Sequence, residues 1–247
     1  MEMRALTGLA AAGILWAGQA SAVTDYDACI DLIAADPRQA EVEAGEWARF
    51  GGGAPARHCY ALALVVTGAP SRAIDELLGI AAEEPDLEDP ERADILGQAG
   101  NLLVQEGDMV TANVVAAQAL RMDAKNPTAL ALRARLKLDA GEPRAAIRDL
   151  DAALQARPGV VDFLILRSTA HRQLSQFVEA RDDAAFASEQ APNDAQVWLE
   201  RGLAESALND KVAARDSFLE AIALDREGLV GKSAQRALQR MDAGIVD

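Results

Sequence analysis

One turn landmark recurs at a constant spacing along most of this chain. Gly107 and Gly141 each follow an apolar segment, 34 positions apart, and the same step leads to Ser175 and Asn209. Each of these positions opens a turn before another Ala-rich segment, and Gly68 is the corresponding landmark earlier in the chain. A period of this length predicts a stacked array of small, similar units, each of which needs its neighbours to bury its apolar face.

The period divides the chain into units with one interruption. The units are 54–87, 93–126, 127–160, 161–194 and 195–228, and a short insertion, 88–92, follows the first of them. We interpret the acidic stretch 83–89, which overlaps it, as a solvated insertion broken by proline. Pro158 and Pro192 keep the same spacing, and each closes a predicted helix. Ala, which has the best intrinsic helix propensity, is frequent, and few β-branched or aromatic runs favour a sheet. The sequence therefore predicts an all-α protein.

Small residues recur at fixed places within the units. The eighth position is occupied by Ala61, Gly100, Ala134, Ser168 and Gly202, and the twentieth by Ala73, Ala112, Ala146, Ala180 and Ala214. Two antiparallel helices approach closely only where the residues that face each other are small. Each unit is therefore expected to be a tight helical hairpin.

This pattern resembles the tetratricopeptide repeat, a 34-residue helix–turn–helix unit with small-residue columns and a helix-ending proline. The stretches 138–141 and 153–158 match it well, whereas the aromatic residue at position four is present only as Trp198. Proline is also missing from the ends of the second and fifth units. The resemblance implies a right-handed α-solenoid of about five repeats with a capping helix at each end.

Both ends of the array differ from its middle, as capping requires. Residues 23–53 are interpreted as an N-terminal helical cap or degenerate repeat, with helices at 25–36 and 38–50. The segment 229–247 is interpreted as a C-terminal capping helix, over 229–242, and a tail. Val230, Ala234 and Met241 lie on one face of that predicted helix.

Residues 1–22 have the parts of a secretory signal peptide. Arg4 is followed by an apolar run and then by Ala20-Ser21-Ala22, so cleavage is expected after Ala22. An apolar run of about 13 residues is too short to span about 30 Å of hydrocarbon. We therefore expect no stable membrane span after cleavage. The resemblance and the leader together indicate an exported bacterial member of the family, located in the periplasm.

Cys29 and Cys59 are the two cysteines of the chain. An even number of cysteines in an oxidising compartment favours a disulfide bond. Two alternatives are a pair of buried free thiols, since cysteine also packs as a small apolar residue, and a catalytic thiol.

The sequence contains little that could support catalysis or cofactor binding. His58 and His171 lie three repeats apart and cannot assemble a zinc site locally. No glycine loop for phosphate and no nucleophile motif is present. We therefore predict no enzymatic activity, no catalytic residue, no metal and no cofactor. The net charge of −15 disfavours binding to nucleic acid.

Two charged columns recur together in the repeats. The first holds Arg133, Arg167 and Arg201, and the second, in the following helix, holds Asp149, Asp183 and Asp216. An arginine ladder for anionic ligands is one interpretation. Pairing of each Arg with an Asp inside its repeat is the preferred one, because it explains why both columns recur together.

The resemblance implies a function in protein interaction, with recognition in a groove lined by the first helices. The family's groove positions fall here on Asn101, Gln105, Arg135, Leu138, Ile165, Thr169, Arg172, Gln173, Leu199 and Leu203. We hypothesise a non-enzymatic periplasmic scaffold that binds a protein or peptide segment by apolar contacts and arginine. The alternative is a regulator of envelope polysaccharide or peptidoglycan machinery, or of cell division. A third interpretation is that the groove residues only pack against neighbouring helices.

Overall fold

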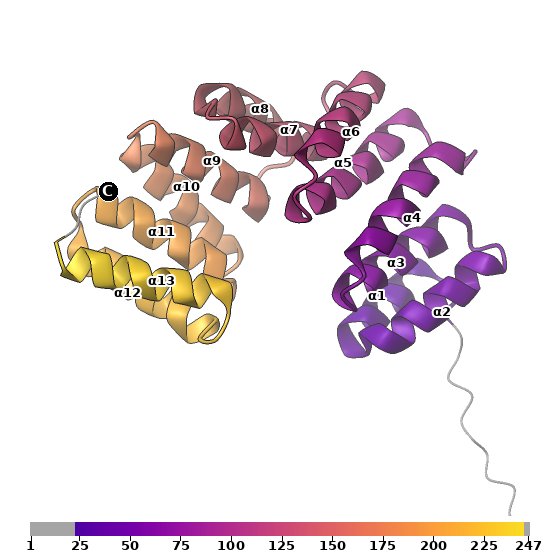
Figure 1. The fold of residues 1–247 in the computed structure, drawn as a ribbon, viewed down its shortest axis with the longest axis horizontal. Coiled ribbons are helices and arrows are strands. Elements are labelled where there is room, and N and C mark those ends of the chain that lie inside the picture. Colours follow the sequence, from indigo (N-terminus) through magenta and orange to yellow (C-terminus); the bar gives the residue numbers. More distant parts are fainter. Residues whose placement is uncertain (1–22, 245–247) are drawn as a thin grey trace, which may run out of the picture.

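A computed structural model describes residues 23–244, which form thirteen helices joined by short turns (Figure 1). The helices are α1 (Tyr26–Ala35), α2 (Pro37–Arg49), α3 (Gly53–Val66), α4 (Pro70–Glu83), α5 (Asp89–Gln105), α6 (Met109–Met122), α7 (Pro127–Asp139), α8 (Pro143–Ala156), α9 (Val161–Gln173), α10 (Phe177–Gln190), α11 (Ala195–Ala207), α12 (Lys211–Leu224) and α13 (Leu229–Asp242). No strand occurs among these residues, so the all-α prediction is confirmed. The predicted signal peptide, 1–22, lies outside the described residues.

Each predicted unit is a hairpin whose turn needs an unusual backbone conformation. The hairpins are α3–α4, α5–α6, α7–α8, α9–α10 and α11–α12. The turn residues have positive φ angles of 84° at Gly68, 84° at Gly107, 75° at Gly141, 59° at Ser175 and 60° at Asn209. Glycine adopts this left-handed region without steric cost. The repeating landmark in the sequence therefore marks a repeating left-handed turn.

The small-residue columns lie at close helix contacts, either inside a hairpin, as at Gly202, or against the next repeat, as at Gly100, which faces Leu132 of α7. Every residue at the eighth and twentieth positions is buried. At Gly202, an added Cβ would lie 2.6 Å from Cδ1 of Phe218, a ring that is itself 1% exposed. The phenyl ring of α12 therefore fills the space that the missing side chain leaves on α11.

The hairpins stack into an arch, which Figure 1 shows with both ends pointing the same way. Consecutive first helices touch along the chain α5, α7, α9, α11 and α13, whereas no two second helices among those described come into backbone contact. The first helices therefore occupy the shorter, concave side of the curve.

The acidic stretch 83–89, interpreted as a solvated insertion broken by proline, is exposed or half-buried, and residues 84–88 form the loop between α4 and α5. The insertion 88–92 is helical from its second residue onward. Helix α5 begins at Asp89, and the side chain of Glu91 accepts a hydrogen bond from the backbone N–H of Glu88 at 2.9 Å. Arg92 donates to backbone carbonyls at the end of α4, including that of Ala81 at 2.6 Å. The insertion is helical because it is capped at its start and fastened to α4 by Arg92. It also separates α3 from α5, whose backbones do not touch.

The array ends at α13, which spans the predicted residues. Its Ala234 and Met241 are buried in one cluster with Phe218 of α12. Arg236 stands one repeat period after Gly202, at the eighth position, where the complete repeats have a small residue. Arg236 is exposed, so α13 has a charged side chain at the position where the complete repeats receive their second helix.

Candidate functional site: the concave face

A hollow of about 370 Å³ opens between the first helices of three consecutive repeats. Its walls are formed by Val104 of α5, Met109 of α6, Arg135, Leu138 and Asp139 of α7, and Leu166, Thr169 and Gln173 of α9. Four of these residues, Arg135, Leu138, Thr169 and Gln173, were predicted as groove residues. The structure therefore brings side chains from two neighbouring repeats to one place on the concave side.

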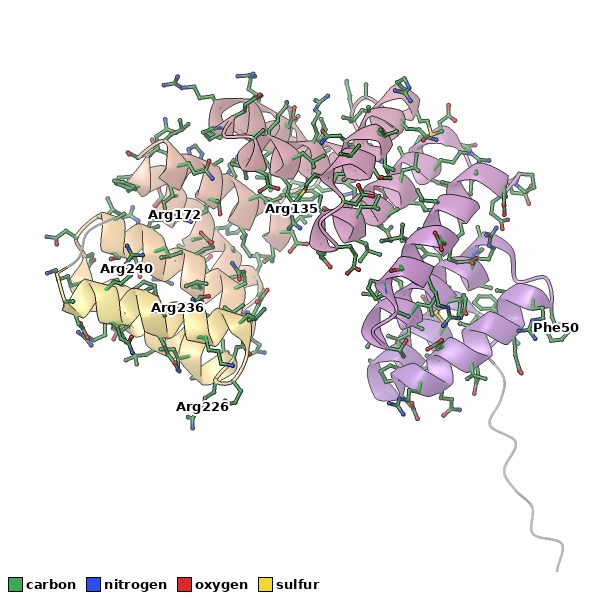
Figure 2. All side chains as sticks on the ribbon, viewed as in Figure 1. Phe50, Arg135, Arg172, Arg226, Arg236 and Arg240 are labelled. Atoms are coloured by element: carbon green, nitrogen blue, oxygen red, sulfur yellow. A yellow bond between two sulfur atoms is a disulfide. The ribbon has the colours of Figure 1, made fainter. Side chains whose placement is uncertain are left out.

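Arg135 is the cation of this hollow (Figure 2). It is half-buried, and within residues 23–244 no hydrogen bond or ion pair involves its guanidinium group. Asp139 follows one helical turn later and lines the same hollow. Arg135 can therefore bind an incoming acidic group without first breaking an ion pair of its own.

Arg172 differs from Arg135 because it already has a buried partner. Its Nη2 atom lies 3.5 Å from Oε2 of Glu200, a residue of α11 that is 6% exposed. Burial raises the pKa of Glu200, and the nearby Arg172 and Thr169 partly offset this effect. Reversing the charge of Arg172 would place two acidic groups together, so this residue also stabilises the contact between α9 and α11.

The remaining predicted groove residues are spread along the inner helices. Asn101 and Ile165 are half-buried, and Gln105 is exposed at the end of α5. Leu138 and Leu199 are each 8% exposed, and Leu199 packs with Phe218 and Met241. Leu203 is partly buried against the same cluster. The apolar members therefore contribute to helix packing, and the polar members provide most of the accessible surface.

The preferred interpretation of the charged columns is confirmed for two repeats. Arg133 donates two hydrogen bonds to Asp149, both at 2.8 Å, and Lys137 adds a third at 2.7 Å. Arg167 donates to Asp183 at 2.8 and 2.7 Å. Burial alone would raise the pKa of Asp149, but the bonds from Arg133 and Lys137 outweigh it and lower that pKa. These arginines therefore connect the two helices of a repeat.

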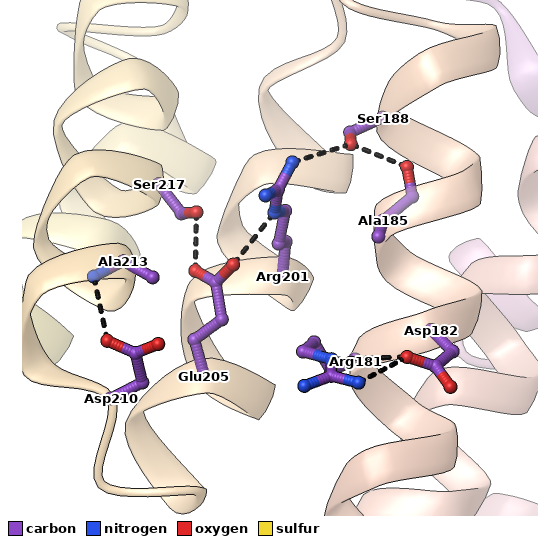
Figure 3. A network of polar contacts seen from close by, with 9 residues as sticks. All are labelled: Arg181, Asp182, Ala185, Ser188, Arg201, Glu205, Asp210, Ala213 and Ser217. Carbon is purple, nitrogen blue, oxygen red and sulfur yellow. Dashed lines mark hydrogen bonds and ion pairs between the residues drawn. The ribbon is translucent and has the colours of Figure 1, made fainter.

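The prediction of a third pair, Arg201 with Asp216, is wrong (Figure 3). Arg201 donates through Nε to Glu205 of its own helix at 2.8 Å, and Ser217 of α12 donates to the same carboxylate at 2.6 Å. Asp216 is exposed, because Ser217 and not Asp216 stands one repeat period after Asp183. Glu205, which is 3% exposed, supplies the carboxylate that this column lacks.

The N-terminal arm, α1 to α4, contains the predicted disulfide bond. Cys29 of α1 and Cys59 of α3 are bonded, with their Cα atoms 6.4 Å apart, and both are fully buried. Beside them, His58 forms hydrogen bonds of 2.7 Å with Tyr26 and with Gln98 of α5. Within the described residues, no group of three His, Cys, Asp or Glu side chains is arranged to hold a metal ion. None of the described helices is both long and apolar enough to cross a membrane.

Sequence reasoning missed Glu200 and part of the wall of the hollow. Glu200 stands in a column where the two preceding repeats have Leu132 and Leu166, so a charge in an apolar column was the available signal. Val104, Asp139 and Leu166 also line the hollow from first helices, but nothing in the sequence distinguished them from their neighbours. Met109 lies on the second helix α6, and only the structure could place it at the hollow.

Comparisons with solved structures show that the arch has the tetratricopeptide repeat fold. The chain superposes on a chain of the APC/C hetero-tetramer Cut9-Hcn1 with a TM-score of 0.72, at 16% identity, covering 87% of this chain and 45% of that one. It superposes on TTC0263, a thermophilic tetratricopeptide repeat protein of Thermus thermophilus, with a TM-score of 0.54, at 21% identity, over 62% of this chain and 82% of that one. For MamA of Desulfovibrio magneticus RS-1 the TM-score is 0.51 at 19% identity, over 69% of this chain and 93% of that one.

Sequence comparison is more limited. No family model matches the chain. The human protein SGT1 homolog is 30% identical over 98 residues, which are 40% of this chain and 27% of that protein. The fold and the repeat geometry together define the class: the protein is an α-solenoid with the tetratricopeptide repeat fold.

Proposed function

We propose that this protein is a non-enzymatic periplasmic scaffold that binds a segment of a partner protein in its concave groove. The observation that carries the proposal is the hollow lined by Arg135, Leu138, Thr169 and Gln173. None of the residues that line the hollow is arranged as a nucleophile with its base. The hollow is therefore suited to recognition rather than to catalysis.

The chemistry of the hollow indicates the kind of segment that would fit. Val104, Leu138 and Leu166 offer an apolar floor, and Thr169 and Gln173 offer hydrogen-bonding groups beside it. Arg135 is a cation without an ion-pair partner in the described part of a chain whose net charge is −15. An amphipathic segment with an acidic side chain would be anchored by the apolar residues and oriented by Arg135.

A solved neighbour supports interaction as the role of this fold. The chain that superposes on most of this one belongs to the hetero-tetramer Cut9-Hcn1. That structure shows the fold in a protein assembly, and we extend this general role, though not the partner, to the present chain.

Export is supported by the Cys29–Cys59 bond, since disulfides persist in oxidising compartments. The alternative role at envelope polysaccharides needs aromatic surfaces on which sugars stack. Trp47 packs in the disulfide cluster, and Trp198 donates to the carbonyl of Pro192 while Arg201 covers its ring. Neither side chain favours that alternative.

The proposal is tested with two charge reversals. Arg135→Glu changes the hollow, and Arg144→Glu makes the same change on α8, an exposed site on a second helix. Immobilised protein is used to capture a partner from an envelope fraction, and its affinity for each variant is measured. We expect more than a ten-fold loss for Arg135→Glu and none for Arg144→Glu, with melting temperatures within about 2 °C of the wild type. Equal affinities of the two variants for the partner would show that the partner does not bind at Arg135.

A further inference from the structure

Val23, the residue that follows the predicted cleavage point, is packed into the N-terminal arm. Its side chain is 7% exposed and lies in one cluster with Cys29, Ala44 and Cys59. Its backbone nitrogen lies 3.0 Å from Oε2 of Glu43 on α2. A main-chain nitrogen this close to a carboxylate, next to a predicted cleavage point, has a different chemistry before and after processing.

Cleavage changes the donor from an amide to an ammonium group. Water adds across the Ala22–Val23 peptide bond with the help of a signal peptidase: the hydroxyl goes to the Ala22 carbonyl carbon, and the proton goes to the Val23 nitrogen. The new α-amino group is largely protonated at neutral pH. The hydrogen bond from the neutral amide to the Glu43 carboxylate then becomes an ion pair between two charged groups, which adds a Coulombic attraction to the hydrogen bond.

Glu43 is positioned to receive this group. Its second oxygen, Oε1, accepts a hydrogen bond of 2.7 Å from Nε2 of Gln39, one turn earlier on α2. This contact holds the carboxylate in place and leaves Oε2 for Val23. Glu46, on the same helix, is exposed and accepts no such bond from a described residue, so it provides a matched control.

We propose that Glu43 is a binding site for the mature N-terminal ammonium group of Val23, so that the N-terminal arm is completed only after export. The inference rests on the proposed export of the protein. Two covalent events of export, peptide cleavage and disulfide formation, then act on the same small cluster. The arm gains its full stability in the compartment where the protein works.

The first measurement is the N-terminal sequence and intact mass of protein recovered from the periplasm, with Val23 expected as the first residue. The second compares two purified forms, both with the Cys29–Cys59 bond formed. One begins at Val23, and the other keeps a single Ala before it, which restores the amide. Each form is made as the wild type and with Glu43→Gln or Glu46→Gln.

We expect Glu43→Gln to lower the melting temperature by about 2–4 °C in the form that begins at Val23 and by less than half as much in the extended form. Glu46→Gln should change neither form. An equal effect of Glu43→Gln in both forms overturns the proposed site even when export is established. Uncleaved protein in the periplasm instead overturns the proposed cleavage after Ala22, and protein retained in the cytoplasm overturns the proposed export.

Discussion

The helices of the N-terminal arm and those of the array from α7 to α12 are held together by different kinds of contact. In the array, each hairpin uses buried small residues and a shared arginine–carboxylate contact, repeated with little change. In the arm, individual long-range contacts dominate: the Cys29–Cys59 bond, Arg57 with Glu76 and Glu84, and Arg72 with Glu41. The array therefore depends on its period, and the arm depends on particular residues.

This difference has an energetic consequence. In a solenoid each repeat contacts only its neighbours, so stability is roughly a sum of local terms. The backbones of α3 and α5 do not touch at the insertion, so α4 makes most of the contact with α5, in a shared hydrophobic cluster. Damage at the disulfide, between α1 and α3, should therefore stay largely in the arm, whereas damage to a repeat should spread to the repeats that stack on it.

The largest effect is expected from removing the disulfide bond with Cys29→Ala and Cys59→Ala together. The bond closes a loop with a sequence separation of 30, and its loss should cost about 3–4 kcal/mol in the chain-entropy model. Hydrogen exchange should rise in α1 to α3 and remain low in α7 to α12. Faster exchange across α7 to α12 would show that arm and array are one cooperative unit.

A slightly smaller effect is expected inside the array from Gly202→Leu. The added side chain meets the ring of Phe218, which has no room to move, so overpacking should cost about 2–3 kcal/mol. Thermal unfolding is the measurement, and Ala207→Leu at an exposed site of the same helix is the control. Equal melting temperatures for the two variants would mean that the small-residue column does not determine the packing.

Asp149→Asn should cost about 2 kcal/mol at neutral pH, because the bonds from Arg133 and Lys137 lose their charged acceptor. The folded state lowers the pKa of Asp149. Its contribution is therefore complete above the unfolded value of about 4 and is lost as the pH falls through the lower folded value. Urea unfolding at several pH values should show the difference between variant and wild type shrinking only below about pH 4. A difference that is the same under strongly acidic and neutral conditions would contradict this role.

The smallest effect is expected at Asp216, because Arg201 forms its ion pair with Glu205 instead. Asp216→Asn at an exposed site should change stability by less than about 0.5 kcal/mol. Glu205→Gln should cost about 1.5–3 kcal/mol, because Arg201 and Ser217 both donate to that carboxylate. Chemical unfolding is the measurement. A larger loss of stability for Asp216→Asn than for Glu205→Gln would support the predicted pair of Arg201 with Asp216.

The same contrast explains what the sequence could predict. Columns at a fixed period report packing needs that recur, so the five hairpins, the positive-φ turns and two arginine pairs were predictable. The helical start of α5 was not, because its cap and Arg92 occur once. In the last repeat the carboxylate comes from Glu205 of the first helix, and not from the second helix as in the two repeats before it. A repeating column in the sequence does not reveal such a change of helix. In the groove, the sequence identified residues by position, but the buried partner of Arg172 separates it from Arg135 only in three dimensions.

The central claim, that partners bind on the concave side, is tested most directly by cross-linking in the cell. A photo-reactive amino acid is placed at Gln173, which is exposed in the hollow, or at Val178, which is 49% exposed on the second helix α10. We expect a discrete cross-linked protein from position 173 that is absent from position 178, and that weakens when Arg135→Glu is added. A cross-linked partner from position 178 and none from position 173 would show that partners bind the outer face instead.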